Sequence, residues 1–173
     1  MSSPLQSDFV VDETVIPIGQ AIFFDNWLHP TSLPSPAQVR QSEDAHSLKH
    51  ADVSRNRQQV ICFPHLQLVV KFGHISTTPV SEGQTLWLLS FLPHMRVPKV
   101  YGWCEDAGQR FIYMEYIEGV TAKKRWPLLS APEKQDVAEQ LNLMVSSMRC
   151  LKQAPGNTYI GPSSCHMWPL PLY

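Results

Sequence analysis

Two neighbouring stretches in the middle of the chain show the alternation of positions that is typical of β-strands. Residues 60–63 and 66–72 are rich in β-branched and aromatic side chains, and the Pro64-His65 pair between them favours a hairpin. One face of the second stretch carries Leu66, Leu68, Val70 and Phe72. The other face carries Gln67, Val69 and Lys71, because successive side chains of a strand point to opposite sides. We therefore predict that Lys71 lies opposite the core face.

A helix is predicted after this hairpin. Ser81 and Gln84 have the spacing of a capping box, and the helix is expected to run to Leu92 and to stop at Pro93. Glu82 then falls in the first helical turn. Taken alone, a glutamate at that position indicates only a favourable charge at a helix start.

Residues 97–103 and 110–116 are predicted to be two further strands. They are joined by a turn at residues 106–108, whose glycine is expected to need a positive φ angle. Gly119 then lets the chain leave the second of these strands. Four strands with one helix between the second and the third predict an α+β fold, a curled antiparallel sheet with a helix packed on it.

A long amphipathic helix is predicted after that sheet. Ser130 and Glu133 form a second capping box, and Pro132 is compatible with a first helical turn. An apolar stripe at spacings of four and three comprises Val137, Leu141, Met144, Met148 and Leu151. The helix is expected to end at Pro155. If no further part of the protein covers this stripe, it must fold back on the sheet, pair with a second copy or bind a partner.

The two ends of the chain carry weaker patterns. We expect residues 1–58 to be a poorly ordered extension, in which the apolar residues 18–28 either form one short helix or dock on the main body. Residues 59–120 are predicted to form the sheet and its helix, residues 121–155 the linker and long helix, and residues 156–173 an irregular tail.

Composition narrows the choice of function. The net charge is −1 and the pI is about 6.6, so no basic field favours nucleic acid or an anionic membrane as a partner. No apolar run approaches the length of a membrane span, and four dispersed cysteines without a secretion signal are typical of reduced thiols in the cytoplasm. Cys62 and His65 have the spacing of zinc ligands, but a second ligand pair is missing, so no metal site is predicted.

A strand lysine, a helix glutamate and a Met-Glu-Tyr-Ile-Glu-Gly segment follow one another in the order found in the small lobe of a kinase-like phosphotransferase. In such sites the lysine reaches the α and β phosphates of the nucleotide, and the glutamate holds the lysine by an ion pair. Lys71 and Glu82 lie on elements of the required type. Each signal alone has an ordinary structural explanation, since an isolated strand lysine most often faces water at a sheet edge.

Six blocks occur in a fixed order along the chain. They are VVKFG (69–73), SEGQTLWLL (81–89), VPKVYGW (97–103), FIYMEYIEGVT (111–121), EKQDVAEQL (133–141) and LKQAPGNTYIG (151–161). In this order they resemble the aminoglycoside phosphotransferase family, and in particular its group in filamentous fungi. The resemblance implies a kinase-like small lobe, followed by a long helix from the start of a large lobe. It also implies ATP or GTP with Mg²⁺ as the cofactors, and a small hydroxylated molecule as the acceptor.

The same resemblance implies which residues bind the nucleotide. These are Lys71, Glu82, Met114, Glu115 and Ile117. Met114 would stand at the back of the adenine pocket, and backbone groups of Glu115 and Ile117 would form the hinge that hydrogen-bonds the adenine edge.

Full-length members of that family continue into a catalytic loop with a His-Gly-Asp core and then a metal-binding aspartate. Nothing here matches those positions, since the last aspartate is Asp136 and the last carboxylate is Glu139. We therefore expect a truncated, catalytically incomplete phosphotransferase with no catalytic or metal-binding residue of its own. The alternative is a noncatalytic module that binds a nucleotide or a partner. No glycine lies between Gly19 and Gly73, so the phosphate-binding loop also departs from the family pattern.

Overall fold

The computed structural model describes residues 9–11, 16–24, 33–42, 46–47 and 58–153 of the 173-residue chain. Its main body is an antiparallel sheet with the strand order β2-β6-β7-β5-β4-β3. The strands of this sheet are β2 (Ile22–Phe23), β3 (His46–Ser47), β4 (Gln59–Phe63), β5 (Leu68–His74), β6 (Val100–Asp106) and β7 (Gln109–Glu115). The helices are α1 (Pro36–Gln41), α2 (Val80–Leu89), α3 (Ala122–Arg125) and α4 (Ala131–Arg149), with 3₁₀ turns η2 (Pro64–Leu66) and η3 (Trp126–Leu128). A separate parallel pair joins β1 (Phe9–Val11) to β8 (Leu151–Gln153).

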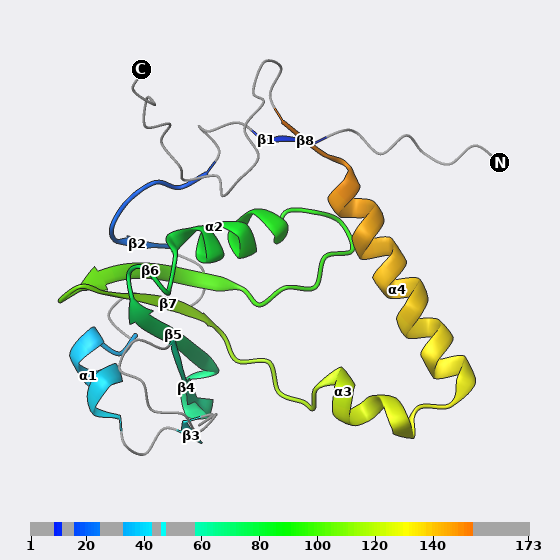
Figure 1. Cartoon of the computed structure of the whole chain (residues 1–173), viewed down its shortest axis with the longest axis horizontal. Coiled ribbons are helices and arrows are strands. Elements are labelled where there is room, and N and C mark those ends of the chain that lie inside the picture. Colours follow the sequence, from blue (N-terminus) through cyan, green and yellow to red (C-terminus); the bar gives the residue numbers. More distant parts are fainter. Residues whose placement is uncertain (1–8, 12–15, 25–32, 43–45, 48–57, 154–173) are drawn as a thin grey trace, which may run out of the picture.

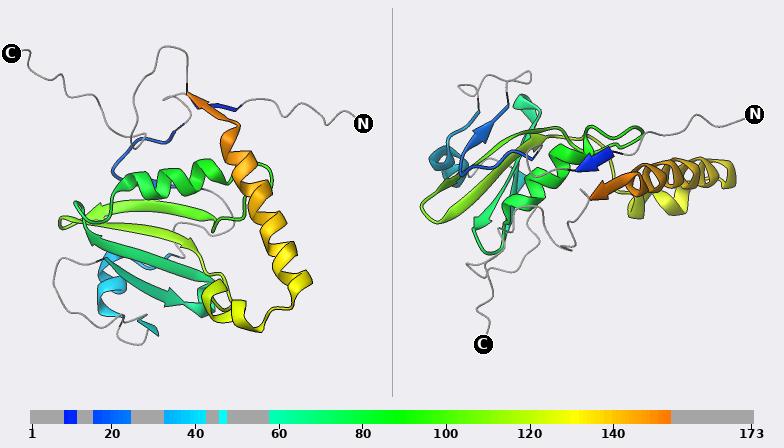
Figure 2. Two further views of the ribbon diagram at one scale, coloured as in Figure 1. Left: turned by 45° about the vertical axis from the view of Figure 1, so that its right-hand side comes forward. Right: turned by 90° about the horizontal axis from the view of Figure 1, so that it is seen from above.

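This architecture confirms the predicted α+β class and the predicted four antiparallel strands with a helix between the second and the third. Two strands of two residues each, β2 and β3, extend the sheet at its edges. Figure 1 shows α2 lying along the sheet, and the views in Figure 2 show α4 beyond the ends of the strands rather than over a face. The sheet and α2 are therefore the body on which a site can be built.

The turn between β6 and β7 differs from the prediction in one backbone angle. Ala107 and Gly108 have φ angles of 50° and 74°. Two successive positive values are typical of the two-residue hairpin turn that matches the twist of the strands. The sequence predicted a positive angle for the glycine alone. Ala107 adopts one as well, because this turn needs it at both central positions.

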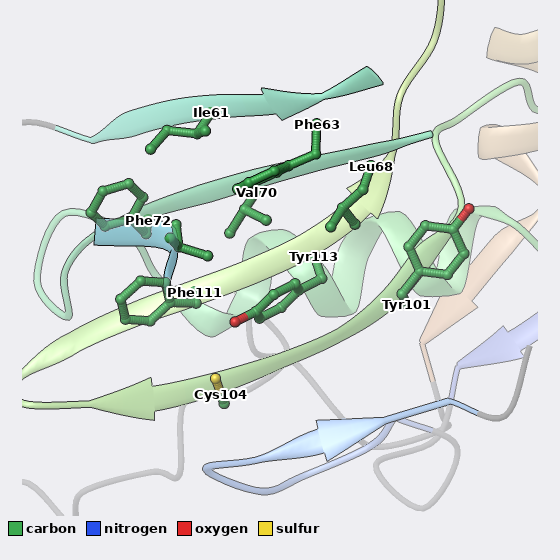
Figure 3. Packing of buried hydrophobic residues seen from close by; sticks show 10 residues of the cluster. Ile61, Phe63, Leu68, Val70, Phe72, Tyr101, Cys104, Phe111 and Tyr113 are labelled. Carbon is green, nitrogen blue, oxygen red and sulfur yellow. The ribbon is translucent and has the colours of Figure 1, made fainter. Parts of the chain in front are cut away.

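One face of the sheet carries the larger hydrophobic core. Its buried side chains are Val39, Ile61, Phe63, Leu68, Val70, Phe72, Tyr101, Cys104, Phe111 and Tyr113. Figure 3 shows most of them on the near side of the strands, with α2 behind the sheet. Helix α1 covers this face through Val39, and Arg40 fixes α1 by a 2.6 Å ion pair to Asp106 and a cation–π contact 5.0 Å above the ring of Phe111.

The opposite face of the sheet lies under α2. Val100, Trp103 and Ile112 are buried there, and Ile22, Phe24, Val80, Leu86 and Met114 pack around them. A Cβ atom at Gly83 of α2 would lie 2.9 Å from Cε3 of Trp103. The lack of a side chain at residue 83 therefore sets how closely α2 approaches the sheet.

Stability should fall at alkaline pH because of a buried tyrosine. Burial is the main cause that raises the pKa of Tyr113 well above its ordinary value, and the neighbouring Cys104 adds to the rise. The folded state thus holds the Tyr113 proton more tightly than the unfolded state. This stabilisation is fully present below the unfolded pKa of about 10 and is lost as the pH rises above it. We expect urea denaturation to give a free energy of unfolding that decreases steadily above about pH 10.

Tyr113→Phe is the matched variant for this prediction. It should flatten part of the alkaline decrease, with a remaining slope from Cys104 and Tyr101, whose pKa values burial also raises. At neutral pH the variant should be less stable by about 1 kcal/mol, because the 3.0 Å hydrogen bond from the Tyr113 hydroxyl to the Pro34 carbonyl is lost. An unchanged alkaline slope in Tyr113→Phe would contradict the assignment.

Helix α2 begins and ends earlier than predicted. Its N-cap is Pro79, without a side-chain hydrogen bond, so the predicted capping box of Ser81 and Gln84 is wrong. Gln84 is buried and donates instead to the Pro17 carbonyl at 2.9 Å, which makes its amide unavailable to cap the helix. The regular helix ends at Leu89, and tighter turns with hydrogen bonds between residues three apart continue to Leu92.

Residues 16–24 and 33–42 are packed on the main sheet, within the stretch 1–58 that the sequence predicted to be a poorly ordered extension. The predicted short helix over residues 18–28 is not found in its described part, residues 18–24, where β2 pairs with β6 instead. Docking on the main body, the other interpretation, is what the structure shows. Likewise Ser35 and Gln38 form a capping box that starts α1, within the predicted poorly ordered extension. Both differences arise because apolar residues here find partners far along the chain.

The long helix α4 confirms the second predicted capping box, since Ser130 and Glu133 exchange both hydrogen bonds. The helix ends at Arg149, and Leu151 belongs to β8 rather than to the helical stripe. The predicted end at Pro155 and the tail 156–173 lie outside the described residues. Of the stripe, Val137 and Met144 are half-buried, whereas Leu141 is 54% and Met148 is 40% exposed. None of the helices that the structure describes is long and apolar enough to cross a membrane.

Candidate functional site

Lys71 occupies the centre of β5, and the strand register places it between two apolar residues. Val60 of β4 and Ile112 of β7 are its cross-strand partners. The alternation predicted from the sequence is confirmed, because Leu68, Val70 and Phe72 are buried in the core on the opposite face. Lys71 therefore points to the face that α2 covers, and its side chain is 20% exposed.

Glu82 meets Lys71 from the first turn of α2. The ammonium of Lys71 donates to both carboxylate oxygens, at 2.6 Å to Oε1 and 2.8 Å to Oε2. The Glu82 side chain is 30% exposed, so the pair is sheltered but still reached by solvent. The structure thus brings together the two residues that the sequence paired from element order.

The value of this pair for stability is small. Ion pairs that solvent reaches contribute about 0–1 kcal/mol, since the Coulomb attraction is offset by desolvation and lost side-chain freedom. What the pair does provide is position, because two hydrogen bonds to one carboxylate fix the ammonium in space. A lysine ammonium has three donors, so one remains for an anion that approaches the same face.

The loop that leads into α2 is held by a second group of polar contacts. Arg110 donates to the Thr78 carbonyl at 2.8 Å and to the Ile75 carbonyl at 3.4 Å, and it forms an ion pair with Glu105. Gly73 lies under the same loop, where an added Cβ would come within 2.8 Å of Oγ1 of Thr78. These contacts fix where α2 starts, and therefore where Glu82 stands.

An apolar surface adjoins Lys71 on its own face of the sheet. Val69 lies two residues before Lys71 on the same face of β5, and the strand register pairs it with Met114 of β7. Val60, Val69 and Met114 are all half-buried rather than buried. Met114 therefore lies on the Lys71 face, and it packs against the cluster beneath α2.

The chain leaves β7 at Glu115. Some of the polar groups of residues 115–117 form hydrogen bonds within the protein, and others do not. The Glu115 N–H donates to the Lys99 carbonyl at 2.8 Å, and its carboxylate accepts from the Lys99 N–H at 3.1 Å. The Tyr116 N–H donates to the Gln67 carbonyl. In the part of the chain that the structure describes, no hydrogen bond uses the N–H of Ile117, a residue that is 61% exposed. A free backbone donor is what the predicted hinge requires at this residue.

Metal-binding groups do not gather near this pair. Among the described residues, no group of three or more His, Cys, Asp or Glu side chains could hold a metal ion. Burial raises the pKa of the Cys62 thiol, and His65 lies against the ring of Phe63. These positions agree with the interpretation of Cys62 as a packed thiol rather than a ligand.

Some residues near the site were missed by sequence reasoning. Val60 could have been found from the pairing of β4 with β5, since it lies opposite Lys71, and Val69 was placed on the Lys71 face without being assigned to the site. Gln84 and Phe24 could not, because their roles depend on a contact between the N-terminal residues and α2. Comparison with protein-family models, with curated proteins and with solved structures gave no match.

Proposed function

We propose that residues 59–120 form the nucleotide-binding lobe of a kinase-like protein of the aminoglycoside phosphotransferase type, and that they bind ATP or GTP. The observation that carries the proposal is the ion pair of Lys71 with both carboxylate oxygens of Glu82. A lysine fixed in this way on a strand, with one donor left, suits the α and β phosphates of a nucleotide. Because this partly exposed ion pair contributes little to stability, its main effect is to position the Lys71 ammonium, which can then bind an anion.

The adenine would lie on the apolar surface next to this pair. Val60, Val69 and Met114 offer half-buried side chains for the base, and the free N–H of Ile117 stands at the strand end as a donor. Glu115 would contribute its backbone and not its carboxylate, since the carboxylate is bonded to Lys99. The five residues implied by the resemblance thus have distinct roles in the proposed site.

We propose nucleotide binding and not phosphoryl transfer for these residues. Transfer requires a residue that orients the acceptor hydroxyl and carboxylates that hold Mg²⁺. The described residues do not fit Mg²⁺ on their own, because Glu82 is bound to Lys71 and no other carboxylate joins it. A nucleotide could bring the ion with its own phosphates. A cytoplasmic location, where such nucleotides are abundant, is part of the proposal.

Thermal unfolding with Mg-ATP or Mg-GTP tests the proposal. A nucleotide that binds only the folded state should raise the transition temperature, and stabilise by about 2.7 kcal/mol at 100 times its Kd. Lys71→Ala should abolish the rise, because the donor to the phosphates is removed. Lys124→Ala, at an exposed lysine of α3, is the matched control and should keep it.

Two results would count against this function. No rise in the wild-type protein would leave it without support. A rise that persists in Lys71→Ala would place the nucleotide elsewhere on the chain.

A second candidate function is association with another copy through α4. Leu141 and Met148 of the helical stripe are 54% and 40% exposed, more than is usual for a packed helix. Sedimentation at increasing protein concentration distinguishes this candidate, since it requires a dimer and the nucleotide site does not.

A further inference from the structure

We propose that residues 16–24, here named the N-terminal strap, are a positioning element that holds α2 so that Glu82 reaches Lys71. This inference rests on the proposed function for its purpose, and its geometry is independent of it. The strap crosses from α2 to the edge of the sheet, and it makes polar contacts with both. It joins α2 to β6, the strand over which α2 lies.

Two hydrogen bonds connect the strap to its neighbours, one to α2 and one to β6. The Gln84 amide donates to the Pro17 carbonyl at 2.9 Å, and the Trp103 indole donates to the Gly19 carbonyl at 3.1 Å. Gln84 is 1% exposed, and its Oε1 has no partner among the described residues. A buried amide kept with only half of its hydrogen bonds is costly, so the contact with Pro17 is the one that fixes it.

Aromatic rings continue the contact. Phe24 stacks on Trp87 of α2 with ring centroids 5.9 Å apart and an interplanar angle of 17°. The same ring meets Trp103 of β6 edge-on at 5.6 Å. Phe24 therefore lies between the helix and the sheet, and links them at Trp87, five residues along α2 from Glu82.

Gly102 allows the strap to come this close. The strap strand β2 pairs with β6, with Phe23 opposite Gly102. An added Cβ at Gly102 would lie 2.4 Å from the carbonyl oxygen of Ile22, where no side chain fits. The strap thus occupies a place on β6 that only glycine leaves open.

Three successive residues of α2 show the consequence. Glu82 reaches Lys71, Gly83 rests on the ring of Trp103, and Gln84 reaches the strap. Because neighbouring helical residues are 100° apart, the helix is held from three directions. Without the strap only two remain, and a small rotation of α2 would take the Glu82 carboxylate out of hydrogen-bond range of Lys71.

Competitive amine labelling, read by mass spectrometry, tests this proposal on the full chain without any nucleotide. Lys71 should react slowly in the wild-type protein, because its ammonium is held by Glu82. Glu82→Gln gives the reference rate for a released lysine. Phe24→Ala and Gln84→Ala should raise the Lys71 rate to that reference, while Lys123 and Lys124 keep their rates. Thr85→Ala, an exposed neighbour of Gln84, is the matched control and should change nothing.

Circular dichroism of the aromatic bands shows whether each variant is folded. If Phe24→Ala or Gln84→Ala does not fold, Gly102→Ala is a third variant that displaces the strap. Folded strap variants that keep the slow Lys71 rate of the wild type would overturn the proposal. Failure of the nucleotide function is seen separately, as the absence of a thermal shift with Mg-ATP in the wild-type protein. Where Mg-ATP does bind, the strap variants should weaken its affinity and Thr85→Ala should not.

Discussion

Replacing Trp103 by alanine is expected to lower the free energy of unfolding by about 3–5 kcal/mol. The side chain is fully buried, and it contacts α2 at Gly83 and the ring of Phe24. Truncation removes this packing, leaves a cavity that a sheet held on both sides cannot close, and deprives the Gly19 carbonyl of its donor. Urea denaturation followed by circular dichroism measures the change.

The same substitution at an exposed tryptophan is the matched control. Trp126, in η3, is 43% exposed, so Trp126→Ala should change the free energy of unfolding by no more than about 0.5 kcal/mol. Equal effects of the two substitutions would show that Trp103 is not the centre of the core beneath α2.

Gly83→Ala is expected to destabilise the protein, although alanine is the better helix former. The gain in helix propensity is about 1 kcal/mol. The new Cβ would lie 2.9 Å from Cε3 of Trp103, and overpacking of a rigid core costs about 1–3 kcal/mol. Because a fully buried ring has no room to withdraw, we expect the overpacking to exceed the gain. The shift of α2 should also weaken any nucleotide-dependent rise in transition temperature, since Glu82 is the adjacent residue.

Gly83→Ala made in a Trp103→Leu variant tests whether the contact with Trp103 causes the destabilisation. In Trp103→Leu the ring is gone, so Gly83→Ala should be neutral or stabilising there, by up to about 1 kcal/mol. If Gly83→Ala costs the same in both backgrounds, the contact with Trp103 is not what it disturbs.

Two capping boxes were predicted from the same spacing, and their different outcomes show what a sequence can and cannot reveal. Ser130 and Glu133 lie on an exposed helix start, where no other group competes for them, and their box is present. Ser81 and Gln84 have equally good spacing, but Gln84 is buried against Pro17. Local spacing predicts a local hydrogen bond only where no distant partner offers a better one.

The candidate site follows the same division. Strand alternation predicted the side on which Lys71 lies, and element order predicted that Glu82 would meet it, because both are set by residues close in sequence. The N-terminal strap was not predicted. Its strand has two residues, too few for a period, and its position depends on Gly102 far along the chain. The sequence therefore predicted the parts of the site but not what holds α2 over them.

The strand pairings also bear on the order in which the protein folds. β6 and β7 are joined by a two-residue turn, and β4 and β5 by η2, so these hairpins close short loops at little entropic cost. The strap and β6 are separated by about half of the chain, and β1 and β8 are separated by about four fifths of it. Contacts of such separation form slowly. We therefore expect the hairpins to assemble first and Glu82 to be fixed opposite Lys71 only in a late step of folding.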